Sequence, residues 1–292
     1  MTAARPTPIL ALVAALAVTF AACTADADDS GSPNPTAGQG EASLIVANSP
    51  DTVTTNGVQR VLVAVIGPGG ANDFLGGPDD PATVTFTSVE SGSSSEVTGA
   101  WVANDGVDLG LYAVPVTFDD PGVWEVTLTS NAATASTLMN VGRESSVPGL
   151  GDAAPPSITP TAGDVDDLAE ISTDPEPDPA FYELTIADAV ANGRPTVVVF
   201  ATPAFCQTAL CGPTVEIIKT TMADHADVDV VHVEPFVLDE ARAGSLVPVE
   251  TMAEWGVQTE PWVFVVAADG TIAATFEGIL GPDELGAALT AL

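Results

Sequence analysis

The chain has 292 residues, of which 46% are hydrophobic and 16% charged, so it is long enough and apolar enough for two folded domains. Its 40 acidic side chains against 6 Lys and Arg give a formal net charge of −34. This balance excludes nucleic acid as an expected partner, because phosphate binding needs clustered basic residues. It also excludes adsorption of the folded part to an anionic membrane surface, and it is typical of a highly soluble protein.

The chain begins with the pattern of a secretory signal. Arg5 is the only charged residue before an apolar run at 9–22, which is shorter than the about 20 residues that a membrane-spanning helix requires. Residues 20–23 read Phe-Ala-Ala-Cys, which resembles the lipobox of bacterial lipoproteins, although phenylalanine stands where leucine is usual. The resemblance implies a signal peptide at 1–22, a lipid on the sulfur of Cys23, and an extracytoplasmic protein anchored to the cell membrane. The alternative is a plain signal peptide followed by a chance cysteine.

The first half of the mature chain predicts a tether and a β-sandwich. Residues 23–41 are Asp, Ser, Gly, Pro and Thr with little apolar content, which is typical of a disordered tether. Residues 42–142 contain short alternating apolar runs separated by turn residues, and about seven such strands predict an antiparallel sandwich. We expect the strands at 43–47, 59–66, 83–89, 97–102, 110–118, 123–129 and 134–141. The run at 110–129 resembles the end of immunoglobulin-like accessory domains in bacterial envelope proteins. With no histidine and no cysteine, this half is expected to bind or to act as a spacer.

The second half predicts an α/β domain after a linker. Residues 143–179 are rich in Pro and acids, and we expect a semi-extended linker that lets the two domains move. From residue 180, Thr185 can cap a short helix, and strands flank a helix that starts near Pro213. A β-α-β unit predicts two parallel strands. The expected order is helix 186–191, strand 195–200, helix from 213, strand 228–233, helix 248–255, hairpin strands 262–267 and 271–276, and helix 282–292.

This order resembles the thioredoxin fold over residues 180–292. The motifs that carry the resemblance are cysteines at the first strand–helix junction, the run Cys211-Gly-Pro, and Pro261 just before an apolar strand. The resemblance is closest to membrane-anchored thioredoxin-like proteins of bacterial envelopes. It implies a cis Pro261, with Glu260 beside the cysteines, and thiol-disulfide exchange through Cys206 and Cys211, which would pair as a disulfide. The implied partners are envelope or secreted proteins with thiols or disulfides. The bilayer would be contacted through the N-terminal anchor only, and no cofactor or metal is expected.

The spacing of the two cysteines departs from that family, because four residues separate them where thioredoxins have two. A five-residue step in an ideal helix rises ~7.5 Å, whereas a disulfide needs Cα atoms about 4.4–6.8 Å apart. Therefore either Cys206 lies in the turn before the helix, or the first helical turn unwinds on oxidation. We expect Cys206 to attack and Cys211 to resolve, with the reverse order left open. Lys219 lies too far along the helix to assist, and His232 is expected to be structural.

Three other functions compete with thiol-disulfide exchange. The cysteine pair could be a permanent structural disulfide in a redox-inactive fold. The protein could be a peroxidase, because Thr202-Pro203 before Cys206 resembles a peroxiredoxin subgroup, but the threonine–proline pair lies one residue too far from the cysteine and no arginine follows Arg242. It could also bind or deliver copper, as thioredoxin-fold metallochaperones do, although the histidine ligand of those proteins has no counterpart after Pro261.

Overall fold

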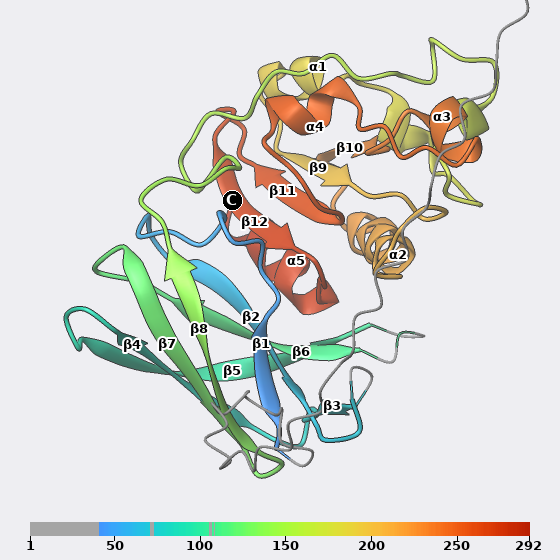
Figure 1. Ribbon diagram of the computed structural model, residues 1–292. Coiled ribbons are helices and arrows are strands. Elements are labelled where there is room, and N and C mark those ends of the chain that lie inside the picture. The colour runs from blue at the N-terminus through green and yellow to red at the C-terminus, as the bar shows by residue number, and fades with distance from the viewer. Residues whose placement is uncertain (1–40, 71–72, 105–106, 108) are drawn as a thin grey trace, which may run out of the picture. The chain divides into compact units, whose positions relative to one another are not determined.

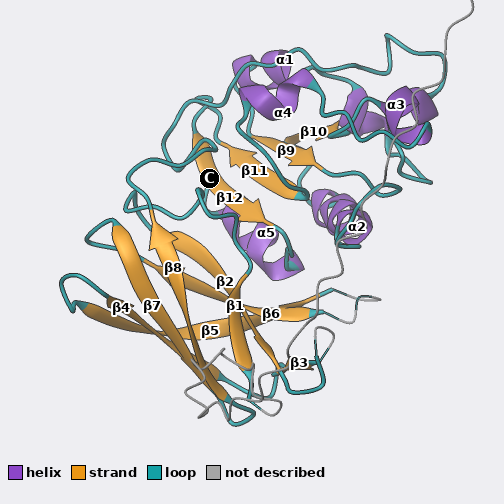
Figure 2. Cartoon of the chain, in the orientation of Figure 1, coloured by secondary structure: helices purple, strands orange, loops and turns teal. Residues whose placement is uncertain are grey.

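The computed structural model describes residues 41–292, except 71–72, 105–106 and 108. The chain from Gln39 to Leu292 forms one compact unit. It contains an antiparallel β region at residues 43–141, and an α/β region at residues 179–292 (Figures 1 and 2). The expected signal peptide, Cys23 and nearly all of the expected tether lie outside the described residues. Within the described part of the chain, no helix has both the length and the apolar character that crossing a bilayer requires.

The β region is a sheet of eight antiparallel strands. Its order is β1-β2-β6-β5-β4-β7-β8, with β3 paired to β2, and the two end strands β1 and β8 also contact each other, so the sheet is nearly closed. The expected strands are present, and β3 is an addition that the sequence pattern did not predict. The hydrogen bonds form one continuous path rather than two separate sheets, so the immunoglobulin-like sandwich stays a prediction. The strands are β1 (Ser43–Val46), β2 (Gln59–Ile66), β3 (Phe74–Leu75), β4 (Ala82–Ser88), β5 (Ser94–Ala103), β6 (Gly110–Val116), β7 (Gly122–Thr129) and β8 (Thr134–Val141).

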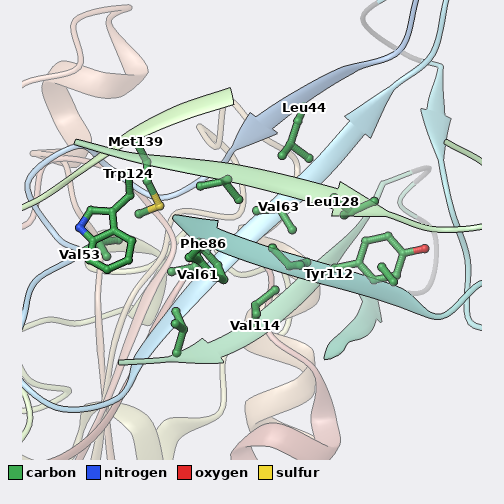
Figure 3. Packing of buried hydrophobic residues seen from close by; sticks show 14 of the residues in the cluster. Leu44, Val53, Val61, Val63, Phe86, Tyr112, Val114, Trp124, Leu128 and Met139 are labelled. Carbon is green, nitrogen blue, oxygen red and sulfur yellow. The ribbon is translucent and has the colours of Figure 1, made fainter. Parts of the chain in front are cut away.

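The core of the β region follows from the alternation of its strands. In β4, residues 82, 84, 86 and 88 are buried and the residues between them are half-buried, as expected for a strand with one face toward a core. Phe118 packs edge-on against Phe86 and Trp124, with ring centroids 5.4 Å and 5.0 Å apart. Figure 3 shows side chains from different strands, such as Phe86, Val63 and Leu128, gathered in this one core.

The α/β region has a four-stranded sheet in the order β10-β9-β11-β12. β9 pairs parallel to β10, and β11 pairs antiparallel to both β9 and β12. The predicted β-α-β unit and hairpin are therefore confirmed. Every residue of β9 and β11 is buried, as expected for central strands that are covered on both faces. The strands are β9 (Thr196–Phe200), β10 (Asp229–Val233), β11 (Trp262–Val266) and β12 (Ile272–Glu277).

Five helices complete the α/β region, and one of them was not predicted. The cap of α1 is as expected, because Thr185 Oγ1 accepts a hydrogen bond of 3.0 Å from the backbone amide of Asp188. The unpredicted helix is α3, a short element in the acidic segment after β10. The helices are α1 (Ile186–Ala191), α2 (Cys211–Met222), α3 (Leu238–Arg242), α4 (Glu250–Glu254) and α5 (Pro282–Thr290), together with the 3₁₀ turn η2 (Pro179–Tyr182); another 3₁₀ turn, η1 (Leu168–Glu170), lies in the preceding segment.

The segment between the two regions, residues 143–178, differs from the semi-extended linker that its composition indicates. Val147 and Ala154 are buried in one hydrophobic cluster of the α/β region, and Leu168 packs against another. Asp174 forms an ion pair of 2.6 Å with Lys219 of α2. These contacts hold the segment against the α/β region, because its scattered apolar residues find partners there that the local composition does not reveal.

Candidate functional site

The two cysteines lie at the junction between the central strand β9 and helix α2. Cys206 and Cys211 are at disulfide distance, with their Cα atoms 6.0 Å apart. Cys211 is the first residue of α2 and Cys206 lies in the turn before it, so the first of the two arrangements expected from the spacing is the observed one. The helix begins two residues before Pro213. Proline is tolerated there because the amides of the first turn have no partner within the helix.

The two sulfur atoms have different surroundings. Cys211 is 0% exposed and belongs to the same hydrophobic cluster as Val199 and Ala201, whereas Cys206 is half-buried. The backbone amide of Cys211 donates a hydrogen bond of 3.3 Å to Cys206 Sγ, and Thr208 Oγ1 lies 3.4 Å from the same sulfur. Hydrogen bonds to an ionised group stabilise the charged form. After reduction, these donors would favour the thiolate at Cys206, which is also the less buried of the two cysteines.

Glu260 brings a carboxyl group to the sulfur atoms. The bond between Glu260 and Pro261 is cis, as the resemblance implied, and the buried Pro261 leads directly into β11. A carboxylate oxygen of Glu260 and the two sulfur atoms all lie within 4.8 Å of one another. Burial raises the pKa of the half-buried Glu260 above its usual value, and a hydrogen bond from the backbone amide of Gln207 only partly offsets this. A carboxyl group with a raised pKa beside two sulfur atoms is suited to exchanging a proton with a thiol.

His232 holds the loop that leads to the cysteines. Its Nε2 lies 2.9 Å from the carbonyl oxygen of Ala201, which can only accept, so Nε2 carries the proton. Its Nδ1 lies 2.6 Å from the Tyr182 hydroxyl, which is in turn 2.8 Å from Ser172 Oγ. Burial lowers the pKa of His232, although the nearby Glu234 acts in the opposite direction. A neutral, buried histidine with both ring nitrogens paired fits the structural role expected for it.

Glu234 and Thr173 form a second link to the cysteine loop, which sequence reasoning missed. Glu234 is 7% exposed, and its Oε1 accepts hydrogen bonds from the amide and the hydroxyl of Thr173 at 2.5 Å and 2.6 Å. Thr173 Oγ1 also accepts a bond of 3.1 Å from the amide of Ala204, two residues before Cys206. No local signal could have identified Thr173, because it lies in a segment whose composition indicated a linker.

Lys219, Thr202 and Thr214 make no hydrogen bond to either sulfur in the described structure. Lys219 donates to the carbonyl of Glu176 at 2.8 Å and pairs with Asp174 and Glu216, so its charge is neutralised away from the sulfurs. Thr202 and Thr214 are fully buried, and their hydroxyls have no hydrogen-bond partner among the residues that the structure describes. The expected site residues Cys206, Cys211, Glu260 and Pro261 are thus together, whereas Cys23 lies outside the described residues.

A cleft of about 930 Å³ lies elsewhere in the molecule. Its lining comes from the β region, from residues 143–152, from β11 and β12 and from α5, and it includes Arg60, Arg143 and Trp262. Neither cysteine lines it, and neither does Glu260. The thiol pair is therefore not at the bottom of this cleft. Cys206, the less buried of the two cysteines, is followed by residues 207–209, which are exposed.

Comparisons with known proteins add a distant structural likeness. No protein-family model and no curated protein sequence matches the chain. A solved structure described as "Structure of MTB dsbF in its mixed oxidized and reduced forms" is similar at 21% sequence identity. The match covers 36% of this chain and 84% of that chain, with a TM-score of 0.29.

Proposed function

We propose that the protein is a thioredoxin-like thiol-disulfide oxidoreductase that acts on other proteins outside the cytoplasm. The observation that carries the proposal is the asymmetric pair at the start of α2. One sulfur is accessible and receives hydrogen bonds, the other is buried, and the carboxyl group of Glu260 lies within 4.8 Å of both. A structural disulfide needs none of these features. Thiol-disulfide exchange needs an accessible attacking thiolate, a second thiol to resolve the mixed disulfide, and a group that can move a proton.

The proposed reaction follows the chemistry of the two sulfurs. In the reducing direction, the Cys206 thiolate attacks a substrate disulfide, forms a mixed disulfide and releases one substrate thiolate. Cys211 then loses its proton and attacks Cys206 Sγ, so the second substrate thiol leaves and the pair becomes a disulfide. Glu260 is placed to accept that proton, because its carboxylate can reach both sulfurs. The oxidising direction is the same sequence of steps in reverse.

The location and the fold family are part of the same proposal. The apolar run at 9–22 and the lipobox-like residues 20–23 support export and a lipid anchor on Cys23. The parallel β9–β10 pair, the β11–β12 hairpin and the cis Pro261 support a thioredoxin-like fold for the α/β region. The β region would be an immunoglobulin-like accessory domain, a relationship that rests on the strand pattern of its sequence. Metabolic labelling with a fatty acid tests the anchor, and a Cys23→Ala variant that retains the label contradicts it.

A catalytic assay with a disulfide-bonded protein tests the proposed activity. We expect the full chain to accelerate the reduction of insulin by dithiothreitol, and we expect Cys206→Ser to abolish the acceleration. Cys211→Ser should instead accumulate a mixed disulfide between Cys206 and insulin, because the resolving thiol is missing. If the protein gives no acceleration over dithiothreitol alone, the pair is a structural disulfide and the proposal is wrong.

A second candidate function is the binding of a soft metal ion by the reduced site. The observation in its favour is the compact set of three donor atoms from Cys206, Cys211 and Glu260. Two thiolates suit Cu(I), while the carboxylate is a harder ligand that this ion does not prefer. Titration of the reduced protein with Cu(I) should therefore show binding that Cys206→Ser removes and Glu260→Gln leaves nearly unchanged. Equal binding by wild type and Cys206→Ser would exclude this function.

A further inference from the structure

Leu210 distinguishes the loop between the two cysteines from a simple turn. Of the four residues that separate Cys206 from Cys211, the first three are exposed, whereas Leu210 is 4% exposed. Leu210 does not join the hydrophobic cluster that holds Cys211. It belongs to a cluster to which the β region contributes most of the side chains, so the β region reaches the redox loop directly. We call this group the Leu210 cluster, and its buried members are Leu62, Ala64, Val102, Leu111, Ala113, Leu210 and Ile279.

The backbone just before Leu210 supports a specific anchoring role. Ala209 has a φ of 60°, and it is the one non-glycine residue with positive φ in the part of the chain that the structure describes. Such a conformation is unfavourable for residues with a Cβ, and it persists where the surrounding contacts impose it. Here the turn at Ala209 allows two consecutive side chains, Leu210 and Cys211, to enter two different hydrophobic clusters.

The surface that receives Leu210 is itself fixed to the α/β region. Arg60 of β2 donates two hydrogen bonds of 2.7 Å to the carboxylate of Glu284. Arg60 also donates to the carbonyl oxygens of Glu277 and Ile279 at 3.2 Å and 2.8 Å. Bidentate, charge-assisted bonds of this kind are strong and directional. Because Ile279 is a member of the Leu210 cluster, the same contacts hold one wall of that cluster in place.

We propose that Leu210 is a positioning residue through which the β region sets the reduction potential of the Cys206–Cys211 pair. With Leu210 held, the last residue of the loop stays fixed, and Cys211 remains at a distance from Cys206 that suits a disulfide, 6.0 Å between Cα atoms. Restricting the loop raises the effective concentration of one thiol at the other and favours the bonded state. The inference rests on the proposed function for its biological meaning. It also offers a physical reason why four residues, rather than the two of thioredoxins, separate the cysteines.

Redox equilibrium of the full chain with dithiothreitol tests this role. In that equilibrium one dithiothreitol molecule gives up two electrons and two protons from its two thiols and becomes a cyclic disulfide. The Cys206–Cys211 disulfide takes them up and becomes two thiols. We expect Leu210→Ala to shift the equilibrium constant about tenfold toward the reduced pair, which corresponds to about 30 mV. Leu210→Met should stay within about twofold of wild type, because it restores an apolar side chain of similar volume.

Two further variants separate positioning from a loss of stability. Val102→Ala removes packing atoms that the β region contributes to the Leu210 cluster, so it should shift the potential in the same direction. This variant also provides the test if Leu210→Ala fails to fold. Leu128→Ala removes a side chain that is 0% exposed in the other core of the β region, so it should destabilise the fold and leave the potential unchanged. An unchanged potential in both Leu210→Ala and Val102→Ala overturns the inference, and so does an equal shift in Leu128→Ala.

The result is independent of whether the pair is catalytic. If the wild-type disulfide resists reduction and insulin is not turned over, while Leu210→Ala still shifts the equilibrium, the proposed function fails and the positioning role stands. If insulin is turned over and no variant shifts the equilibrium, the positioning role fails and the proposed function stands.

Discussion

At the scale of single residues, we expect Glu260 to make the reactivity of the cysteine pair depend on pH. Its carboxylate lies within 4.8 Å of both sulfurs, and burial raises its pKa. A carboxylate this close to a sulfur opposes the formation of a thiolate, and a protonated carboxyl does not. The same group can therefore slow the attack by Cys206 at high pH and assist proton transfer where it is partly protonated. Both effects predict that the site changes its behaviour around the pKa of Glu260.

Glu260→Gln should make Cys206 more reactive. The amide removes the negative charge beside the sulfur, so the reduced variant should be alkylated by iodoacetamide about tenfold faster than wild type near neutral pH. The matched control is Glu254→Gln, which changes an exposed glutamate on α4. Peptide mapping of the labelled product identifies the cysteine. Unchanged labelling in Glu260→Gln, or preferential labelling of Cys211, would contradict this assignment of roles.

The same substitution should change the dependence of stability on pH. The folded-state pKa of Glu260 lies above its unfolded value of about 4.3, so the folded state binds this proton more tightly. The stability from this group is present below about pH 4 and is lost as pH rises through the raised pKa. Oxidised Glu260→Gln should therefore be more stable than wild type at pH 7, with the difference shrinking below pH 4. Urea unfolding at the two pH values measures this, and a variant less stable than wild type at pH 7 would show that the sign is wrong.

At the scale of elements, the segment at 143–178 packs against the candidate site. Through Thr173 it bonds to Glu234 and to the amide of Ala204, and through Asp174 it pairs with Lys219 of α2. The contacts to Ala204 and Lys219 end on the loop before Cys206 and on helix α2, whereas the contact to Glu234 ends just after β10. The segment therefore supports the redox loop from the side that faces β10, which a mobile linker could not do.

Lys219→Met tests whether this support depends on the ion pair. The Asp174 side chain is 3% exposed, so removing the lysine leaves a buried carboxylate without its partner, and we expect a loss of about 3 kcal/mol in the free energy of unfolding. Urea denaturation measures the change. The double variant Asp174→Asn with Lys219→Met should recover part of the loss, because the uncompensated charge is gone. Additive losses in the double variant would mean that the two side chains do not interact.

Sequence reasoning predicted the elements better than their connections. The continuous apolar run of β2, the alternation of β8 and the Thr185 cap of α1 are strong local signals, and the bounds of these elements are as predicted. Helix α2 begins at Cys211, two residues before the start near Pro213 that the sequence predicted. Proline is permitted anywhere in the first turn of a helix, so its position does not identify the first helical residue. The single path of the sheet and the packing of 143–178 depend on contacts distant in sequence, which no local pattern encodes.

The same limit applies to the candidate site. The sequence placed Cys206, Cys211, Glu260 and Pro261 in one site because a family resemblance connects their motifs. It could not reveal Thr173 or Leu210, since an exposed-looking threonine in a Pro-rich segment and a leucine in a turn have many ordinary explanations. The role of Thr173 follows from its partner Glu234, which lies 61 residues away in the sequence. The role of Leu210 follows from the side chains of the β region against which it packs.

At the scale of the whole molecule, the β region is joined to the α/β region by a polar contact as well as by the Leu210 cluster. Glu277 at the end of β12 accepts hydrogen bonds from Asn48 at 3.3 Å and from the amide of Ser49 at 2.8 Å. Arg60 bonds to Glu284 and to two backbone carbonyls. The chain has 6 Lys and Arg residues, and one of them, Arg60, links the β region to the α/β region next to the cysteine loop.

Arg60→Ala should destabilise the molecule far more than a comparable change at an exposed arginine. It removes several charge-assisted bonds of a largely buried side chain, so we expect a loss of about 2–3 kcal/mol in urea unfolding. The control is Arg194→Ala, whose partner is Asp229 and whose side chain is 47% exposed, with an expected loss under about 1 kcal/mol. Equal losses for the two variants would indicate that the contact between the regions contributes little.

The reduction potential of the Cys206–Cys211 pair in the full chain tests the central claim most directly. An exchange enzyme needs a disulfide that forms and breaks in its compartment, so we predict a potential above about −300 mV. Equilibration with dithiothreitol or glutathione buffers, followed by thiol alkylation and mass measurement, gives the value. A potential below about −300 mV would mean that the pair is a structural disulfide, and it would contradict the proposed function.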